Sequence, residues 1–339
     1  MPRPKYNSSA TPKRVTMNDI AQVAGVHVMT VSDALNGTGR VAPATRERIV
    51  QLARELNYVP NVAARALSTG RTGRIALLSG ALNEAYYANI VHILKNHVGE
   101  AGYKLLLVHT PNEVKEIADA TENNEIDGAI AIDMHSLVDQ FRLHSSVPCV
   151  SIGVYQRSFV DTVIIDLSAA TEKAIKLMLA TGRKRIAYVV TTVHMAVPEE
   201  GRARAYLNTM ESNGLAPEVI NLNNDSIHEA PSRLTAYIKQ NGCPEGLFCQ
   251  NDEVAMCAYG VLRDLGYRVP DDALLVGCDG QLHMSYFNPP LSTIVQPLEE
   301  ICDTAWRFLQ QRMANPTLPR QHANIAGELR VTASLGSAL

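Results

Sequence analysis

The chain has 339 residues, 46% of them hydrophobic and 19% charged, which is enough for two or three domains around large buried cores. No run of about eighteen apolar residues occurs, so a membrane-spanning helix is excluded, and the basic, polar residues 1–14 lack the apolar segment of a secretory signal. The six cysteines are scattered without a CxxC pair, which favours buried reduced thiols in a cytoplasmic protein over a zinc site.

The formal net charge of −3 conceals an uneven distribution along the chain. Residues 1–74 hold eleven lysines and arginines against four acidic residues, a net charge of +7. The remaining residues hold twenty bases against thirty acids, a net charge of −10. A basic head on an acidic body is typical of a polyanion-binding module that is joined to a part with another task.

Residues 16–36 have the pattern of two short helices joined by a tight turn. Thr16 is a suitable N-cap, and Asp19 lies in the first turn, where a negative charge favours the helix dipole. Gly25 permits the positive φ that ends the first helix, and the second helix is expected to begin at Val28. This pattern predicts a helix-turn-helix, whose second helix enters the major groove of DNA, with an ordinary helical hairpin as the alternative.

A third helix is expected over residues 43–58, with Pro43 at its first position, where a missing N–H does no harm. Ala42 precedes it and offers no side-chain cap. The next segment begins at Asn61, which can cap it, and runs to about Leu67, which is too short for a stable isolated helix. This segment joins the basic head to the acidic body, and folding only on DNA would make it a switch.

From residue 74 onward, short apolar runs of strand type alternate with helical stretches. The runs are RIALLSG, YKLLLVHT, DGAIAI, PCVSIG, RIAYVVTT, GLFCQ and ALLVGCDG, and helices are expected near residues 86–100, 113–122, 168–181, 200–213, 229–241, 252–265 and 298–312. Such alternation predicts parallel sheets covered by helices. Because about six βα units fill this part, two doubly wound subdomains are favoured over one sheet, with ligands at strand ends or between lobes.

These residues resemble the LacI/GalR family of bacterial transcription repressors from about Thr16 to about Ser334. The head carries T-M-N-D-I-A-x-x-A-G-V, T-V-S and Y-V-P-N-x-x-A-R-x-L in register, and the core carries GLFCQNDEVA, GYRVPDDALLVGCDG and NPPLSTIVQP. The resemblance implies a helix-turn-helix head, a hinge helix and a core like periplasmic sugar-binding proteins, with two lobes joined by three crossovers. It also implies a homodimer on a pseudo-palindromic DNA operator, controlled allosterically by a small-molecule effector, for which a sugar or sugar derivative is the family's usual choice.

The fold class expected is a small all-α helix-turn-helix head and hinge helix, joined to an α/β core of two doubly wound parallel-sheet subdomains. We expect a basic arm over 1–15, the DNA-binding domain over 16–60, the hinge helix and linker over 61–73, and the effector-binding and dimerisation core over 74–339. The first lobe of the core is expected over 74–165 and 296–325, and the second over 166–295 and 326–339. No leucine heptad follows the last strand-like run, which favours a dimer over a tetramer.

The resemblance assigns DNA contacts to the head and hinge by position. The assigned residues are Thr16, His27, Val28, Met29, Thr30, Ser32, Asp33, Asn36, Asn61, Arg65 and Leu67. The hydroxyl and amide side chains among them are expected to contact phosphates, whereas Val28 and Met29 would read bases through thymine methyl groups. Leu67 would insert into the minor groove beside its counterpart from the partner subunit, with packing against the core as the alternative.

Asp33 departs from the resemblance, because many relatives carry arginine there and use it on guanine. A carboxylate can accept a hydrogen bond from cytosine N4, or it can hold a neighbour such as His27 or Arg40. The operator sequence common in the family is therefore not carried over.

The resemblance places the effector cleft between the lobes. Its candidate residues follow strands, begin helices or lie in the last crossover: Asn83, Tyr86, Tyr87, Asp133, Arg202, Asn251, Asp252, Asp279 and Gln296. Planar groups with paired donors and acceptors, together with aromatic faces, suit hydroxyl-rich ligands, although each residue could instead be a helix cap or an ion-pair partner. Asp166-Leu167 replaces the common Asp-Asn, so a sugar phosphate, sugar acid, nucleoside or purine stays open, and Arg202 as the one clearly placed base favours a neutral or singly charged ligand.

Two other classes of protein, a solute-binding receptor and a hydrolase, would also be compatible with parts of the sequence. A solute-binding receptor would account for the core but not for the +7 head. A hydrolase could use Asp252 and Asp279, but the chain contains no G-x-S-x-G, P-loop, G-x-G-x-x-G or H-E-x-x-H motif. We therefore predict no catalytic residues, no cofactor and no metal site. The sequence leaves open whether the effector induces or co-represses, and whether a bound promoter is repressed or activated.

Overall fold

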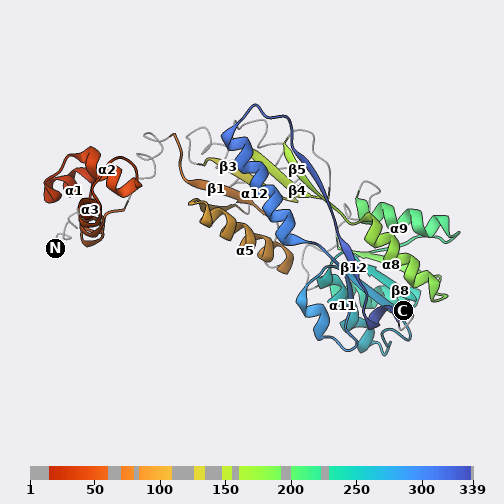
Figure 1. Cartoon of the computed structure of the whole chain (residues 1–339). Helices are drawn as coiled ribbons and strands as arrows, with labels where there is room; N and C mark the ends of the chain where they lie inside the picture. The colour runs from red at the N-terminus through yellow and green to blue at the C-terminus, as the bar shows by residue number, and fades with distance from the viewer. Residues whose placement is uncertain are drawn as a thin grey trace, which may run out of the picture. The chain divides into compact units, whose positions relative to one another are not determined.

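The computed structural model describes residues 15–59, 70–79, 84–108, 126–133, 147–154, 160–191, 200–222 and 229–336. They fall into two compact units, a head over residues 1–70 and a core over residues 71–339 (Figure 1). None of the helices within the described ranges is both long and apolar enough to cross a membrane.

The head consists of the helices α1 (Met17–Ala24), α2 (Val28–Asn36) and α3 (Pro43–Glu55). The expected cap at the start of α1 is present in both directions, because the Thr16 hydroxyl accepts from the Asp19 N–H and the Asp19 carboxylate accepts from the Thr16 N–H. Gly25 ends α1 with a φ of 62°, as expected. The helix α3 is shorter than predicted and, as expected, has no side-chain cap at Ala42.

A small apolar core joins the three helices of the head. Ile20, Val31 and Ile49 are fully or almost fully buried, one from each helix, and Ala24, Ala34 and Ala53 fill the space between them. The small alanines allow the helices to approach closely, so that about forty residues can bury a common core.

The first lobe of the core is a six-stranded sheet in which every pairing is parallel. Its strand order is β11 (His322–Ala326), β5 (Asp161–Asp166), β4 (Cys149–Gly153), β3 (Gly128–Ile132), β1 (Arg74–Leu78) and β2 (Lys104–Val108). The helices α5 (Ala85–Glu100) and α12 (Leu298–Ala314) lie side by side on it (Figure 1). All residues of β3 and β4 are buried, as expected for central strands covered on both faces.

The second lobe is a second six-stranded sheet. Its order is β12 (Glu328–Arg330), β10 (Ser292–Val295), β9 (Leu274–Asp279), β8 (Gly246–Cys249), β6 (Ile186–Val190) and β7 (Glu218–Asn221), and β12 alone among these strands pairs antiparallel. Its helices are α8 (Ser168–Ala180), α9 (Gly201–Ser212), α10 (Ala230–Asn241) and α11 (Asp252–Asp264), with the short turns η3 (Leu282–Tyr286) and η4 (Ala333–Leu335). The two sheets confirm the predicted fold class.

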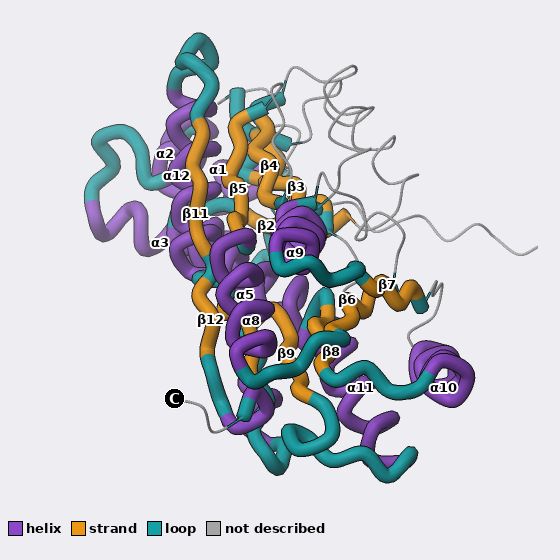
Figure 2. Tube along the Cα trace, turned by 90° about the vertical axis from the view of Figure 1, so that its right-hand side faces the viewer, coloured by secondary structure: helices purple, strands orange, loops and turns teal. Residues whose placement is uncertain are grey.

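The described chain passes between the lobes three times: from β5 to α8, from β10 to α12, and from β11 to β12. Figure 2 shows β11 running on into β12. At this last passage Gly327 lies so close to Leu167 and Ile294 that a Cβ atom would come within 2.5 Å of the Leu167 side chain. Gln296 lies in the second passage and not in the last, so that placement was wrong.

Several strands were missed by the sequence analysis: β5, β7, β10 and β11. Each carries polar residues at alternate or terminal positions, as in DTVIID, EVIN, STIV and HANIA, and so lacks the continuous apolar run by which the other parallel strands were found. The expected helix over 113–122 lies outside the described residues.

Candidate functional site

The start of α2 forms the proposed DNA-reading edge of the head. His27 is the N-cap of α2, and its Nδ1 accepts a hydrogen bond of 3.3 Å from the Met29 N–H. The Met29 side chain is 61% exposed, whereas Val28 is half-buried and packs against the head core. Of the two apolar side chains expected to read bases, Met29 is therefore the more accessible.

Asp33 holds the turn that follows α2. Its carboxylate accepts a hydrogen bond of 3.2 Å from the Thr38 hydroxyl, and the side chain lies against Gly39. One of the two predicted roles for this carboxylate was an interaction with a neighbouring side chain. The neighbour that it bonds is Thr38, not His27 or Arg40. A contact with cytosine stays a prediction and would compete with this hydrogen bond.

The expected phosphate contacts already have partners within the head. The Thr16 hydroxyl donates to Asp19 over 2.7 Å, and the Asn36 amide donates to the Ser32 hydroxyl over 3.3 Å. Because Asn36 has a second N–H and Ser32 keeps its own hydroxyl proton, this pair can still donate to a phosphate. Thr16 would have to release Asp19 first. Thr30 is partly exposed on α2.

Two arginines of α3 stabilise the other helices of the head. Arg46 donates to the carbonyl groups of Asp33, Ala34 and Thr38, each over 3.1 Å, and Arg48 donates to that of Ala24 over 2.6 Å. These carbonyls lie at or just after helix ends, where a positive charge is favoured. That of Asp33 also accepts from the Gly37 and Thr38 N–H groups. Part of the positive charge of the head therefore serves its folding. The assigned residues Asn61, Arg65 and Leu67 lie outside the described residues, as does Asn83 of the core.

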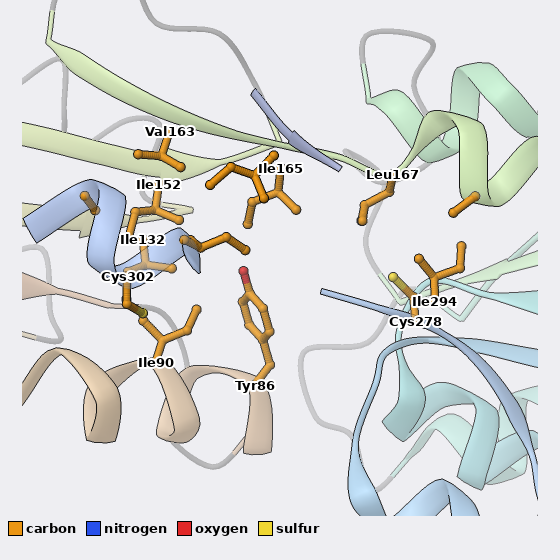
Figure 3. Packing of buried hydrophobic residues seen from close by; sticks show 14 of the residues in the cluster. Tyr86, Ile90, Ile132, Ile152, Val163, Ile165, Leu167, Cys278, Ile294 and Cys302 are labelled. Atoms are coloured by element: carbon orange, nitrogen blue, oxygen red, sulfur yellow. The ribbon is translucent and has the colours of Figure 1, made fainter. Parts of the chain in front are cut away.

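The core gathers Tyr86, Tyr87, Asp133, Arg202 and Asp279 into one electrostatic cluster. Tyr86 and Tyr87 lie in the first turn of α5 with ring centroids 5.1 Å apart, and the pKa of each is raised by burial and then by Asp133. Tyr87 also donates a hydrogen bond to Asp133, which directly follows β3. Figure 3 shows Tyr86 with its hydroxyl pointing away from α5, and Leu167, Ile294 and Cys278 to its right.

The two aspartates of the cluster are difficult to ionise. Burial raises the pKa of Asp133 to about 6, despite the opposing effect of Arg202. Burial, reinforced by Asp252, raises the pKa of Asp279 well above its ordinary value. Both residues also have a positive φ, 51° for Asp133 and 128° for Asp279, in regions that residues other than glycine rarely adopt. Backbone strain of this kind concentrates at functional sites.

Gln296 joins the cluster from the passage between β10 and α12. Its Nε2 donates to a carboxylate oxygen of Asp279 over 2.8 Å. The side chain is 7% exposed, and its Oε1 has no hydrogen-bond partner among the described residues. A buried acceptor without a partner is costly, so this oxygen is suited to receive a donor from a ligand.

Arg202 is tied to groups of its own lobe. Its Nε donates to Glu200 over 2.9 Å and its Nη1 to the Gln250 carbonyl, and both side chains of the Arg202–Glu200 pair are almost fully buried. Burial alone would lower the pKa of Arg202, but Glu200 raises it well above its ordinary value. Glu200 was not among the residues predicted from the sequence, although it lies two residues before Arg202 at the start of a helix.

Asn251 and Asp252 have structural roles at the start of α11. Asn251 is the N-cap and accepts from the Val254 N–H over 2.9 Å. Asp252 is fully buried, and its two oxygens accept from the Thr293 hydroxyl and the Gln281 N–H, each over 2.6 Å. These are the helix-cap roles that the sequence analysis kept as the alternative, and an effector contact stays a prediction for both.

Glu84 is a further member of the cluster that the sequence analysis did not name. It is the N-cap residue of α5, and burial, then Glu253 and Asp133, raise its pKa to about 7. The next N–H, that of Ala85, donates to Glu253 of the second lobe over 3.2 Å, and Asn89 donates to Gln281 over the same distance. These two hydrogen bonds join the lobes beside the cluster.

Comparison with known proteins agrees with this architecture. The family model "Bacterial regulatory proteins, lacI family" matches residues 16–61, and a periplasmic binding protein-like domain matches residues 175–335. The chain belongs to the LacI family. The ribose operon repressor of Haemophilus influenzae is 27% identical over 309 residues, covering 89% of this chain and 92% of that protein.

Two solved structures have the same fold over nearly the whole chain. The Lac repressor dimer bound to operator and the anti-inducer ONPF is 22% identical, with a TM-score of 0.79, covering 96% of this chain and 100% of that one. The transcriptional regulator CelR in complex with cellobiose is 24% identical, with a TM-score of 0.68, covering 95% and 100%. At these identities the two structures show the fold of this chain.

Proposed function

We propose that this chain represses transcription from a pseudo-palindromic operator as a homodimer, and that a small molecule bound by the cluster controls it. The observation that carries the proposal is the composition of the cluster. Asp133 and the two tyrosines come from the first lobe, Asp279 and Arg202 from the second, and Gln296 from the passage between them. A ligand held there contacts both lobes and so favours one of their arrangements.

The head would read DNA with α2 in the major groove, while the segment with Asn61, Arg65 and Leu67 enters the minor groove between two half-sites. The remaining contacts are those assigned by position to Thr16, His27, Met29 and the other residues of α2. A change in how the lobes meet would order or release this segment. The coupling between ligand and DNA is then the difference in ligand affinity between the two arrangements. A repressor of this kind works in the compartment of the chromosome, which for a bacterium is the cytoplasm.

Several observations support a homodimer and a carbohydrate-like ligand. Leu282 and Tyr286, both on η3, are 67% and 68% exposed. Tyr286 also borders a groove of about 570 Å³ whose lining includes Met256 and Phe287. Exposed apolar side chains of this size suit an interface with a second copy. The Lac repressor structure is a dimer, and CelR is in complex with cellobiose. Changing Tyr286→Asp should convert the dimer to monomers in sedimentation velocity.

We also propose that the core binds its ligand without converting it. The hydrolase alternative depended on Asp252 and Asp279. Both oxygens of Asp252 are occupied by hydrogen bonds to its own lobe, and Asp279 accepts a hydrogen bond from Gln296. Incubation with a panel of sugars and glycosides, followed by chromatography, should return every compound unchanged.

The test of the proposed function is selection of bound duplexes from a random DNA pool, with and without a mixture of sugars, nucleosides and amino sugars. A pseudo-palindrome enriched without the mixture and lost with it establishes an inducible repressor. Enrichment that requires the mixture establishes a co-repressor, and fractionation then identifies the active compound. No enrichment under either condition would overturn the proposal.

A further inference from the structure

The cluster offers an excess of hydrogen-bond acceptors. The carboxyl groups of Asp133, Glu84 and Asp279 are linked electrostatically in series, since Asp133 raises the pKa of Glu84 and Glu84 raises that of Asp279. The pKa values of all three are raised, mainly by burial. Placing these groups together is unfavourable in the ligand-free chain, and a positive charge beside them would offset that cost.

The cation of this region is already neutralised. Arg202 lowers the pKa of Asp133 and Asp279, but its Nε donates to Glu200 and its Nη1 to the Gln250 carbonyl. With Arg202 and Glu200 counted as a neutral pair, three carboxyl groups remain that a bound cation would keep ionised. A phosphate or carboxylate ligand would therefore meet repulsion and would have to compete with Glu200 for the guanidinium.

A second, independent observation concerns Gln296. Its Nε2 is used on Asp279, which fixes the orientation of the amide and turns Oε1 into an acceptor. This oxygen is buried and has no partner among the described residues. A ligand that donates a hydrogen bond to this oxygen would satisfy it, and a positive charge on the same ligand would stabilise the nearby carboxyl groups.

We propose that the effector is an organic cation, a hydroxylated primary amine of the amino-sugar type, whose ammonium group lies among Asp133, Asp279 and Glu84. One of its N–H or O–H groups would donate to Gln296 Oε1, and the faces of Tyr86 and Tyr87 would line its path by cation–π attraction. This proposal rests on the proposed function, because it takes the cluster as the effector site. It narrows the ligand from any carbohydrate-like molecule to one with a positive charge.

The charge of the ligand would also explain its control over the lobes. Glu84 and Asp133 belong to the first lobe and Asp279 to the second, so the closed arrangement brings like charges together. A cation between them removes this repulsion only when the lobes are closed. The differential affinity that allostery requires thus follows from the placement of the three carboxyl groups.

The test is equilibrium dialysis of the full-length chain, without DNA, against equimolar matched sets of small molecules at pH 7.5. Each set shares one sugar skeleton: glucosamine, glucose and glucose 6-phosphate, then galactosamine, galactose and galactose 6-phosphate, then mannosamine, mannose and mannose 6-phosphate. Mass spectrometry measures what is retained. At least one amine should be retained about tenfold or more over its neutral and phosphorylated counterparts. Preference for a neutral or phosphorylated member, or no retention of any amine at millimolar concentration, overturns the proposal.

Variants locate the site. Asp279→Asn and Gln296→Met should each reduce retention of the amine by about tenfold or more, whereas Asp303→Asn, the same change of charge on the exposed face of α12, should leave it unchanged. Near-ultraviolet circular dichroism shows whether each variant is folded. Equal loss in all three variants would overturn the assigned position. The dialysis experiment contains no DNA, so it can be interpreted even if the operator selection fails. Conversely, the operator selection can be interpreted even if no amine is retained in dialysis.

Discussion

The head and the cluster of the core use their charged side chains in opposite ways. In the head, Asp19 caps α1, while Arg46 and Arg48 donate hydrogen bonds to carbonyl groups at helix ends. In the core, Asp133 and Asp279 both lie on strained backbone. Gln296, which bonds Asp279, keeps a buried amide oxygen without a hydrogen-bond partner among the described residues. A small unit needs its charges to complete its own helices, whereas a large core can hold charges in unfavourable positions until a ligand offsets them.

The largest effect on stability is expected when a buried charge of the core loses its partner. Arg202→Met should lower the free energy of unfolding of the core by about 3–5 kcal/mol, because Glu200 is left buried without its partner. Chemical denaturation followed by circular dichroism measures this. The exposed neighbour Arg204 supplies the control, since Arg204→Met should change stability little. A loss below about 1 kcal/mol for Arg202→Met would mean that Glu200 is not left desolvated in the variant.

The hinge segment links the two regions, and Leu67→Ala tests whether DNA binding depends on it. Burying a leucine contributes about 1.5–3 kcal/mol, so operator affinity should fall roughly tenfold to a hundredfold. Binding to random DNA, which depends on phosphate contacts, should fall much less. Fluorescence anisotropy with both duplexes separates the two outcomes. Equal loss on both would contradict the wedge role of Leu67.

A smaller effect is expected in the head. Arg46→Ala removes the donor to three carbonyls at the end of α2 and should destabilise this turn by about 1–3 kcal/mol. Hydrogen exchange of the full-length chain should then become faster for the amides of Gly37 and Thr38. Arg54→Ala, on an exposed part of the same helix, is the matched control. Slow exchange in Arg46→Ala would show that the turn depends on Asp33 and Thr38 instead.

The structure of the head could be predicted from the sequence more completely than that of the core, for a physical reason. The head follows from local signals, because Thr16, Gly25 and Pro43 each determine a helix end through their own backbone or side chain. The strand ends that carry Asp133 and Asp279 could be found in the same way, from the apolar runs before them. Such signals need no knowledge of distant residues.

The electrostatic partners in the core could not be derived in this way. Glu84 meets Glu253 across the lobes, and the link is a contact between residues far apart in the sequence. Glu200 is near Arg202 in sequence, but nothing local shows that both side chains are buried. The strand β5 was missed because its first and last residues are aspartates, one of which, Asp161, is held by Arg312 from α12. The burial of a charged side chain and the identity of its ion-pair partner depend on tertiary structure, so they could not be predicted from this sequence alone.

The smallest effect is expected in the pH dependence of stability. This measurement tests directly whether the buried carboxyl groups of the core are difficult to ionise. The pKa values of Glu84 and Asp133 are raised in the folded chain to about 7 and about 6, so the folded state binds their protons more tightly than the unfolded state does. Their contribution is therefore complete below about pH 4 and is lost as the pH rises through 6 and 7. The melting temperature of the ligand-free chain should fall over this range, and Asp303→Asn, which removes an exposed carboxyl group and keeps Glu84 and Asp133, should show the same fall. Glu84→Gln should flatten the upper part of the fall, because an amide does not ionise. If Glu84→Gln follows the parent chain at every pH, the carboxyl of Glu84 is ionised throughout, and the contrast between the two regions rests on the strained aspartates alone.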